Sequence, residues 1–284
     1  MPAQFSAVGQ MLLVLYFLVS ACQQKRVIYT PIGYNITKPE KTELGGKLRE
    51  ISGIAWVDEN TMLAENDEAG KVFTINLQDK KDFKYANFTF GERQDYEDIV
   101  KLGNTLYLLI STGQIVEIPD YNRGGDVQGT LIASVPGKSN EFEAMYYDKE
   151  VNSLILLCKS CHKEKNQVRT AFRFDLATRA FADTAYYTID LNEIRQKLKD
   201  NRADFYPSAA AIHPLQNKLY IVSSIGKLLV ITDKKGKVEQ AIPISAAMFP
   251  QPEGITFAPN GDMYISNEAG DEDRATLLKF IFKP

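Results

Sequence analysis

Short apolar runs separated by turn residues recur along the chain. In the clearest copy, residues 250–270, Glu253-Gly254 precedes a run of β-branched and aromatic residues, a Pro-Asn-Gly-Asp turn follows, and a second run ends in a polar loop. Runs of this length bounded by Gly, Pro, Asn and Asp are typical of β-hairpins. The pattern predicts a hairpin with an acidic residue at its start and a polar loop at its end.

The same unit occurs five times. The corresponding triplets are Ser52-Gly53-Ile54, Glu97-Asp98-Ile99, Glu143-Ala144-Met145, Ser208-Ala209-Ala210 and Glu253-Gly254-Ile255. They lie about 45 residues apart, except for one interval of about 65 that is too short for two units. A fixed period of ~20–50 residues indicates a repeat architecture. We therefore interpret the chain as a repeat protein.

Each unit continues beyond its hairpin. Third strands are predicted at Val72–Leu77, Ile115–Ile118, Ala171–Leu176, Leu228–Ile231 and Leu277–Phe282, and a fourth at, for example, Phe83–Phe90. About 40–50 residues with four strands is typical of a β-propeller blade. The last unit ends without a fourth strand, whereas the strand-like stretch Val27–Leu44 has no unit of its own. We predict an all-β, five-bladed propeller of four-stranded blades, with six blades as the alternative, closed by the N-terminal strand.

The longest interval contains a predicted helix, Asp190–Asn201, between blades three and four. Leu191, Ile194 and Leu198 are spaced for one helical face, and Asp190 is a good N-cap. We expect about three turns on the side where the first strands begin. The helix either covers an apolar patch or acts as a lid over a site.

The N-terminus has the pattern of a signal peptide. The apolar run at residues 11–19 is too short for a membrane span, which needs ~20 residues. Val19-Ser20-Ala21-Cys22 resembles the lipobox of bacterial lipoproteins, although no Lys or Arg precedes the run. We predict a signal peptide at 1–21, lipidation of Cys22, a tether at 22–26 and one propeller domain at 27–284. A plain signal peptide or a buried strand is the alternative.

Gln23, rather than Asp, follows the predicted lipidated cysteine, so inner-membrane retention is not signalled. We expect a membrane-anchored protein of the cell envelope that faces the periplasm or the cell surface. The net charge of −3 and pI near 5.6 argue against nucleic acid as a partner, which requires a concentrated basic surface.

The propeller topology predicts an acidic ring at one mouth of the central channel. The first strands would begin there with Ser52, Glu97, Glu143, Ser208 and Glu253, and the loops after the second strands would bring Glu65, Asn66, Asp67, Asn267 and Glu268. Converging carboxylates require protons or a cation, and oxygen ligands suit Ca²⁺ or Mg²⁺. Alternatively, each Glu caps nearby backbone N–H groups.

We assign the predicted ring in two parts. Candidate metal ligands are Glu97, Glu143, Glu253, Asn66 and Asn267, and the candidate ligand-binding face comprises Ser52, Ser208, Glu65, Asp67 and Glu268.

The sequence Cys158-Lys-Ser-Cys161-His162 matches the haem c attachment pattern. A loop between blade strands offers neither an enclosed apolar pocket nor a second axial ligand, so we do not expect haem. With Cys22 lipidated, a disulfide or dithiol formed by Cys158 and Cys161 is favoured in an oxidising compartment, and metal binding by the three residues is the alternative. His213 precedes a proline in a turn on the other face, so no Ser-His-Asp arrangement emerges and catalytic residues stay unassigned.

Four segments carry a resemblance to a family: REISGIAW (49–56), DYEDIV (95–100), EFEAMYYD (141–148) and QPEGITFAPNGDMYISNE (251–268). Over roughly residues 40–283 the chain resembles the SdiA-regulated family of bacterial envelope proteins. The resemblance implies a propeller at the envelope without a defined activity. More distantly, the acidic mouth is similar to calcium-dependent lactonase, phosphotriesterase and phytase-like propellers, with Glu253, Asn267, Asn66, Glu97 and Glu143 comparable in type.

These observations favour a lipid-anchored propeller that binds an unidentified small molecule or envelope protein at its acidic mouth, with a divalent cation as candidate cofactor. One alternative is a metal-dependent hydrolase of a lactone or phosphoester, in which Glu97, Glu143, Glu253 and Asn267 hold the ion. A second alternative is a scaffold for protein–protein contacts.

Overall fold

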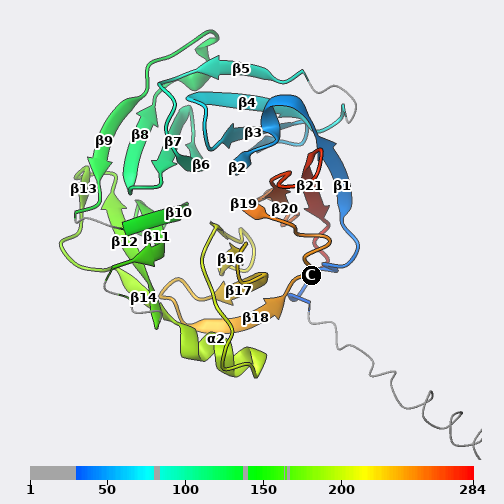
Figure 1. The fold of residues 1–284 in the computed structure, drawn as a ribbon. Helices are drawn as coiled ribbons and strands as arrows, with labels where there is room; N and C mark the ends of the chain where they lie inside the picture. Colours follow the sequence, from blue (N-terminus) through cyan, green and yellow to red (C-terminus); the bar gives the residue numbers. More distant parts are fainter. Residues whose placement is uncertain (1–29, 80–83, 137–139, 163, 165–166) are drawn as a thin grey trace, which may run out of the picture.

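The computed structural model describes residues 30–79, 84–136, 140–162, 164 and 167–284. Five antiparallel sheets surround a central channel and follow one another round the ring in chain order (Figure 1). The predicted five-bladed propeller is therefore confirmed over the six-bladed alternative. The predicted signal peptide and Cys22 lie outside the described residues. Within the described part, no helix is long and apolar enough to span a membrane.

The strands of each blade follow one another from the channel outward. Blade one contains β2 (Ile51–Asp58), β3 (Thr61–Asn66), β4 (Lys71–Asn76) and β5 (Ala86–Thr89); blade two contains β6 (Tyr96–Leu102), β7 (Thr105–Ile110), β8 (Gln114–Ile118) and β9 (Thr130–Ser134). Blade three contains β10 (Asn140–Asp148), β11 (Ser153–Cys161) and β12 (Val168–Asp175). Two short strands, β13 (Ala180–Phe181) and β14 (Tyr187–Asp190), both pair with β12. Together they take the place of the fourth, outermost strand of this blade.

Blade four contains β15 (Ala209–Ile212), β16 (Leu219–Ser223), β17 (Leu228–Thr232) and β18 (Val238–Pro243). Blade five contains β19 (Pro252–Phe257), β20 (Met263–Asn267), β21 (Ala275–Phe280) and, outermost, β1 (Glu40–Leu44). Short 3-10 turns lie at η1 (Gly46–Leu48) and η2 (Tyr121–Arg123).

The N-terminal strand closes the ring as predicted. β1 pairs antiparallel with β21, from Glu40 opposite Lys279 to Leu44 opposite Ala275. The strand is shorter than the predicted Val27–Leu44, and the described residues before it form turns. There Tyr34 is buried against His213 and Phe282. The last blade is thus completed by a strand from the other end of the chain, which removes an open edge.

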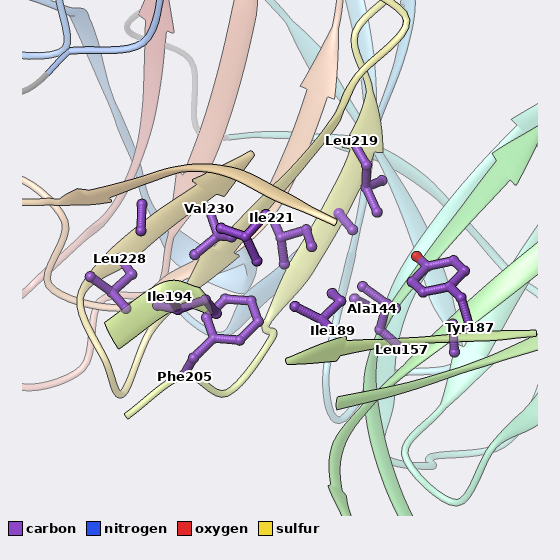
Figure 2. Packing of buried hydrophobic residues seen from close by; sticks show 14 of the residues in the cluster. Ala144, Leu157, Tyr187, Ile189, Ile194, Phe205, Leu219, Ile221, Leu228 and Val230 are labelled. Atoms are coloured by element: carbon purple, nitrogen blue, oxygen red, sulfur yellow. The ribbon is translucent and has the colours of Figure 1, made fainter. Parts of the chain in front are cut away.

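The hydrophobic core lies between the blades. Because side chains alternate along a strand, each sheet presents one apolar face to each neighbour. Figure 2 shows the layer between blades three and four, where Leu157 and Ile189 of blade three approach Ile221 and Val230 of blade four. The adjacent residue Leu156 belongs instead to the layer between blades two and three. The core is therefore a ring of five such layers.

The predicted helix forms, but it is not a lid. α2 spans Leu191–Leu198, about two turns, and the Asp190 carboxylate accepts a hydrogen bond from the N–H of Asn192 at 2.8 Å. Leu191 and Ile194 are buried in the layer of Figure 2, and α2 packs against β18 at the outer rim (Figure 1). Of the two interpretations, coverage of an apolar patch is confirmed.

A β-bulge marks the start of several innermost strands. The strand pairing is irregular at Ser52-Gly53, Glu97, Glu143 and Glu253, each of which has no opposite residue in the register. A bulged residue leaves the ladder and its side chain is re-aimed. The bulges thus lie at one end of the channel, which we call the mouth face; we call the opposite end the basal face.

Two bulges require the glycine that follows the predicted ring residue. A Cβ on Gly53 would lie 2.6 Å from the backbone nitrogen of Ile99 in blade two, and one on Gly254 would lie 2.5 Å from the carbonyl oxygen of Ser52 in blade one. Only a residue without a side chain permits neighbouring blades to approach this closely.

Candidate functional site

Three bulged glutamates carry the acidic character of the mouth face. Burial, followed by the charge of Glu143, raises the pKa of Glu97 to about 10. Burial and the charges of Glu143 and Glu268 raise the pKa of Glu253 to about 8. Burial also raises the pKa of Glu143 to about 7, against the opposing effect of Lys159. The structure thus brings together the three glutamates that the repeat predicted, close enough for Glu143 to disfavour ionisation of the other two.

A second acidic group joins blades one and five. Glu50, Asp67 and Glu268 each place a carboxylate oxygen within 4.8 Å of the others, and all three side chains are half-buried. Burial and then the charges of Glu50 and Glu68 raise the pKa of Asp67 to about 6, whereas burial and then Asp67 and Glu50 raise that of Glu268 to about 7. We call Glu50, Asp67 and Glu268 the carboxylate trio.

Backbone hydrogen bonds fix the positions of two members of the trio. The N–H of Asp67 donates to the carbonyl of Glu50 at 3.2 Å, and that of Glu268 donates to the carbonyl of Gln251 at 2.9 Å. Asp67 Oδ1 is buried and, among the described residues, has no hydrogen-bond partner. A buried polar atom without a partner is costly, so a cation or a hydrogen-bond donor at this oxygen would stabilise the fold.

Lys159 supplies a counter-charge to another part of the mouth face. Its ammonium group contacts the carboxylate of Glu143 and lies 3.1 Å from that of Glu141. Burial acts to lower the pKa of Lys159, but the hydrogen bonds to Glu143 and Glu141 outweigh it and raise the pKa above its ordinary value. Both Lys159 and Glu143 are skipped in the pairing of β10 with β11, so the two bulges bring this pair together.

The two predicted serines serve a different purpose. Ser52 Oγ donates to the carbonyl oxygen of Glu97 at 2.9 Å, and Ser208 Oγ donates to that of Pro252 at 2.6 Å. Both serines are buried, and each bond connects one blade to the next. Their hydroxyls therefore connect neighbouring blades at the mouth face, and their assignment to a ligand-binding face stays a prediction.

Two other predicted residues form hydrogen bonds within the protein. Glu65 is fully buried and accepts a hydrogen bond from the N–H of Gly53 at 2.7 Å, and burial raises its pKa well above the ordinary value. Asn66 donates to the carbonyl of Lys47 and accepts from the N–H of Ala69, both at 2.9 Å. Glu65 thus caps a backbone group, and Asn66 uses both ends of its amide, one towards η1 and one within its own loop.

Asn267 is only partly engaged. Its side chain is fully buried, and its Nδ2 donates to the Thr276 hydroxyl at 3.1 Å. Its Oδ1, like that of Asp67, has no partner among the described residues. Ligation of an ion by Asn267 stays a prediction.

Sequence reasoning missed Glu50, Glu141 and Lys159. Glu50 directly precedes β2, and Lys159 lies between the two cysteines. Glu50 and Glu141 share one position of the unit, two residues before the first residue of the triplet, and Asp95 stands there in blade two. That acidic recurrence could have identified them, whereas nothing in the repeat singles out Lys159.

Cys158 and Cys161 form a disulfide, which confirms the favoured interpretation. Haem attachment through these sulfurs is incompatible with that bond, and the disulfide offers no thiolate to a metal ion. Beside it, Glu164 accepts the N–H of Thr170 at 2.6 Å and pairs with the buried Arg169 at 3.5 Å. With its cysteines paired, the segment from Cys158 to Cys161 therefore has a structural role.

His213 is buried on the basal face as a turn residue, as predicted. Its Nδ1 accepts hydrogen bonds from the N–H groups of Leu215 and Gln216, both at 3.1 Å. Burial lowers the pKa of His213 to about 4, so its imidazole is neutral at pH 7.

The residues of the mouth face fit a hard divalent cation. The trio offers only carboxylate oxygens, and the unpartnered Oδ1 of Asp67 belongs to it. Ca²⁺ and Mg²⁺ prefer such oxygen ligands, whereas zinc sites usually include nitrogen or sulfur.

No family model matches the chain, and no curated protein matches it. Among solved structures, it is similar to a luciferin-regenerating enzyme with a TM-score of 0.53 at 11% identity, covering 86% of this chain and 95% of that one. A glucose dehydrogenase gives a TM-score of 0.56 at 9% identity, covering 85% and 99%. A protein of unknown function from Bacteroides thetaiotaomicron gives 0.50 at 15% identity, covering 81% and 55%. At these identities the similarity shows a shared β-propeller fold, and the resemblance to the SdiA-regulated family stays a prediction.

Proposed function

We propose that this protein is a lipid-anchored propeller of the cell envelope that binds a divalent cation, Ca²⁺ or Mg²⁺, at its mouth face and holds a ligand there. The observation that carries the proposal is the carboxylate trio, whose oxygens lie within 4.8 Å of one another. Two oxygens bound to one Ca²⁺ at about 2.4 Å lie at most about 4.8 Å apart. The spacing of the trio is therefore compatible with three ligands to one ion.

The surrounding charges support a cation rather than protons alone. The charge of Glu143 raises the pKa values of Glu253 and Glu268, and the charge of Glu268 also raises that of Glu253, so ionisation of one carboxylate makes ionisation of its neighbour less favourable. One divalent ion offsets two such charges and does so at neutral pH. A Ca²⁺ ion accepts six to eight oxygen ligands, so three carboxylates leave positions for oxygen atoms of a small molecule or an envelope protein.

We propose binding rather than hydrolysis. The two histidines give no support for a catalytic base at the mouth: His213 is buried on the basal face with its Nδ1 occupied, and His162 is exposed beside the disulfide. Glu97, Glu143 and Glu253 would shape the field around the ion, and Lys159 would hold Glu143 in place.

Calorimetry and thermal unfolding of the purified protein test the cation site. We expect one Ca²⁺ or Mg²⁺ to bind, and at 100 times Kd to stabilise the fold by about 2.7 kcal/mol, which raises Tm by about 5 °C. The double substitution Glu50→Gln and Glu268→Gln should abolish the shift. Glu272→Gln, an exposed residue of the same loop, is the matched control and should retain it.

Absence of any shift with both ions, or an equal shift in the double variant, would overturn the cation site. Turnover of a lactone or phosphoester by the loaded protein, lost on chelation, would replace binding with hydrolysis.

The lipid anchor is tested separately. Mass spectrometry of the N-terminal peptide should find Cys22 as the first residue and acylated. The substitution Cys22→Ser should release the protein from membranes, because acyl chains contribute ~0.8 kcal/mol per buried methylene. An unmodified Cys22 would overturn this part of the proposal and leave the cation site standing.

A further inference from the structure

Three large apolar side chains are exposed together on the basal face. The exposed fractions are 71% for Ile32, 59% for Leu215 and 49% for Ile281. Gln216 Nε2 donates to the carbonyl of Ile32 at 3.1 Å, and the N–H of Lys283 donates to that of Gly33 at 2.8 Å. These bonds make neighbours of three segments that are distant in sequence, so the exposed side chains belong to one area.

Lysines accompany this apolar area. A groove of about 560 Å³ beside it is lined by Lys38, Lys279 and Lys283, with Ile281 and one acidic side chain, Glu40. Lys279 pairs with Asp262 at 3.3 Å, whereas Lys38 and Lys283 are exposed. We call Ile32, Leu215, Ile281, Lys38 and Lys283 the basal patch.

The acidic groups near Leu215 are themselves paired. Glu150 contacts Lys234 and accepts a hydrogen bond from Asn217 at 3.0 Å, and Glu239 contacts Lys218. The basal patch therefore combines apolar side chains with positive charge, the combination found at membrane interfaces.

The chain enters the fold at the basal patch. The described residues begin at Thr30, and β1 then runs from Glu40 on the basal face towards the mouth face, antiparallel to β21. The C-terminus lies beside this start (Figure 1). Cys22 precedes Thr30 by eight residues, which span at most about 28 Å when fully extended. A lipid on Cys22 would therefore keep the basal patch within about 28 Å of the bilayer.

We propose that the basal patch docks on the surface of an anionic bilayer, so that the acidic mouth faces away from the membrane. Ile32, Leu215 and Ile281 would enter the interface, and Lys38 and Lys283 would lie against phosphate headgroups. This inference rests on the proposed lipid anchor, which supplies the proximity. The opposite orientation would press the carboxylates of the mouth face against anionic headgroups, which the like charges disfavour.

Site-specific fluorescence in vesicles tests the docked orientation. The full lipidated protein would be reconstituted into phosphatidylcholine vesicles containing phosphatidylglycerol, with an environment-sensitive label on Leu215→Cys. The matched control is Ile225→Cys, because Ile225 is 62% exposed in the β16–β17 turn on the mouth face. We expect lipid-borne nitroxide to quench most of the fluorescence at position 215 and to leave position 225 unchanged.

Equal quenching at both positions, or none at position 215, would overturn the proposal, provided that both variants keep the wild-type Tm. If the fluorescence of the label at position 215 changes only after envelope proteins are added, the proposal would equally be overturned in favour of a protein partner. Mass spectrometry of the same samples reports the lipid on Cys22, so a missing anchor is distinguished from a failure to dock.

The charge component has its own test. Lys38→Glu with Lys283→Glu should largely remove the quenching at position 215, as should 1 M salt, because both weaken attraction to headgroup phosphates. Vesicles of phosphatidylcholine alone should give weaker quenching. If quenching is unaffected by all three changes, the anionic lipid is not the occupant.

Discussion

The two ends of the propeller both contain buried or half-buried carboxylates, but they neutralise them differently. On the basal face, Asp148 lies 3.2 Å from the ammonium of Lys234, and Asp262 lies 3.3 Å from that of Lys279. Each of these aspartates also accepts a backbone N–H at 3.0 Å. The basal carboxylates are therefore paired and hydrogen-bonded, as burial of a charge requires.

On the mouth face, burial and neighbouring carboxylates raise the pKa values of Glu97 and Glu253 to about 10 and 8. Lys159 directly contacts Glu143 and Glu141. The same chain thus pairs its acids where they stabilise the fold and concentrates them where the channel opens. This difference supports the proposal that the charge on the mouth face serves binding.

The largest expected effect is on the pH dependence of stability without divalent cations. Glu253, Glu143 and Glu268 have pKa values of about 8, 7 and 7 when folded, above about 4.3 when unfolded. The folded state therefore binds more protons between about pH 4.3 and 8, so stability falls as pH rises through that window. In EDTA, Tm should decrease by several degrees between pH 5 and 8.5.

Ca²⁺ should flatten this decrease because it replaces the protons at high pH. A Tm in EDTA that rises over the same range would contradict the charge state of the mouth face. The triple variant Glu143→Gln, Glu253→Gln and Glu268→Gln is the control, and its Tm should vary least.

The next effect compares one carboxylate from each end. Asp262→Asn should destabilise the fold by about 2 kcal/mol, because it leaves Lys279 unpaired and weakens the bond from the N–H of Phe282. Glu253→Gln should leave stability unchanged or raise it, because it removes a repelled charge. Urea unfolding at pH 8 in EDTA measures both, and equal losses would erase the distinction between the two faces.

The sequence was sufficient to predict the fold because the repeat is a local pattern. The triplets at Gly53 and Gly254 and the turn after each first strand recur with one period, and each has a local steric reason. The closing strand could be predicted by counting strands, because one unit lacked a strand and the N-terminus had one more than it needed. The length of this strand could not be predicted, because the contacts of Tyr34 that hold residues 30–39 in turns come from distant segments.

The site was predictable only where it repeats. Glu97, Glu143 and Glu253 occupy one position of the unit and do converge, whereas Glu50 joins the trio through a contact between blades one and five. Hydrogen-bond partners were not predictable either: the hydroxyls of Ser52 and Ser208 bond to neighbouring blades, which their sequence does not show. The position of a residue in a propeller is periodic, but its partners are not.

A smaller effect is expected from the disulfide beside the mouth. It closes a loop of four residues, so its removal by Cys158→Ala with Cys161→Ala should cost about 2 kcal/mol or less. Reduction of the wild-type protein should lower Tm to the same value. If reduction leaves Tm unchanged, the cysteines are not paired in the folded protein.

The smallest expected effect is that of Lys159 on the affinity of the mouth face for a divalent ion. Lys159→Met keeps most of the side-chain volume but removes a positive charge next to Glu143 and Glu141. Attraction of the mouth for a divalent ion should increase, because the field of the remaining carboxylates is no longer offset. We expect the Ca²⁺ affinity to rise about fivefold, measured by calorimetry at low salt, with the gain reduced at 0.5 M salt.

Lys101→Met is the matched control, because Lys101 lines a cavity of about 280 Å³ at the basal end of the same channel. Removal of its charge should leave Ca²⁺ affinity nearly unchanged, since the ion would lie at the far end. Equal gains in the two variants would mean that net charge alone attracts the ion. A gain confined to Lys159→Met means that the ion lies among the carboxylates of the mouth face, where one lysine already competes for them.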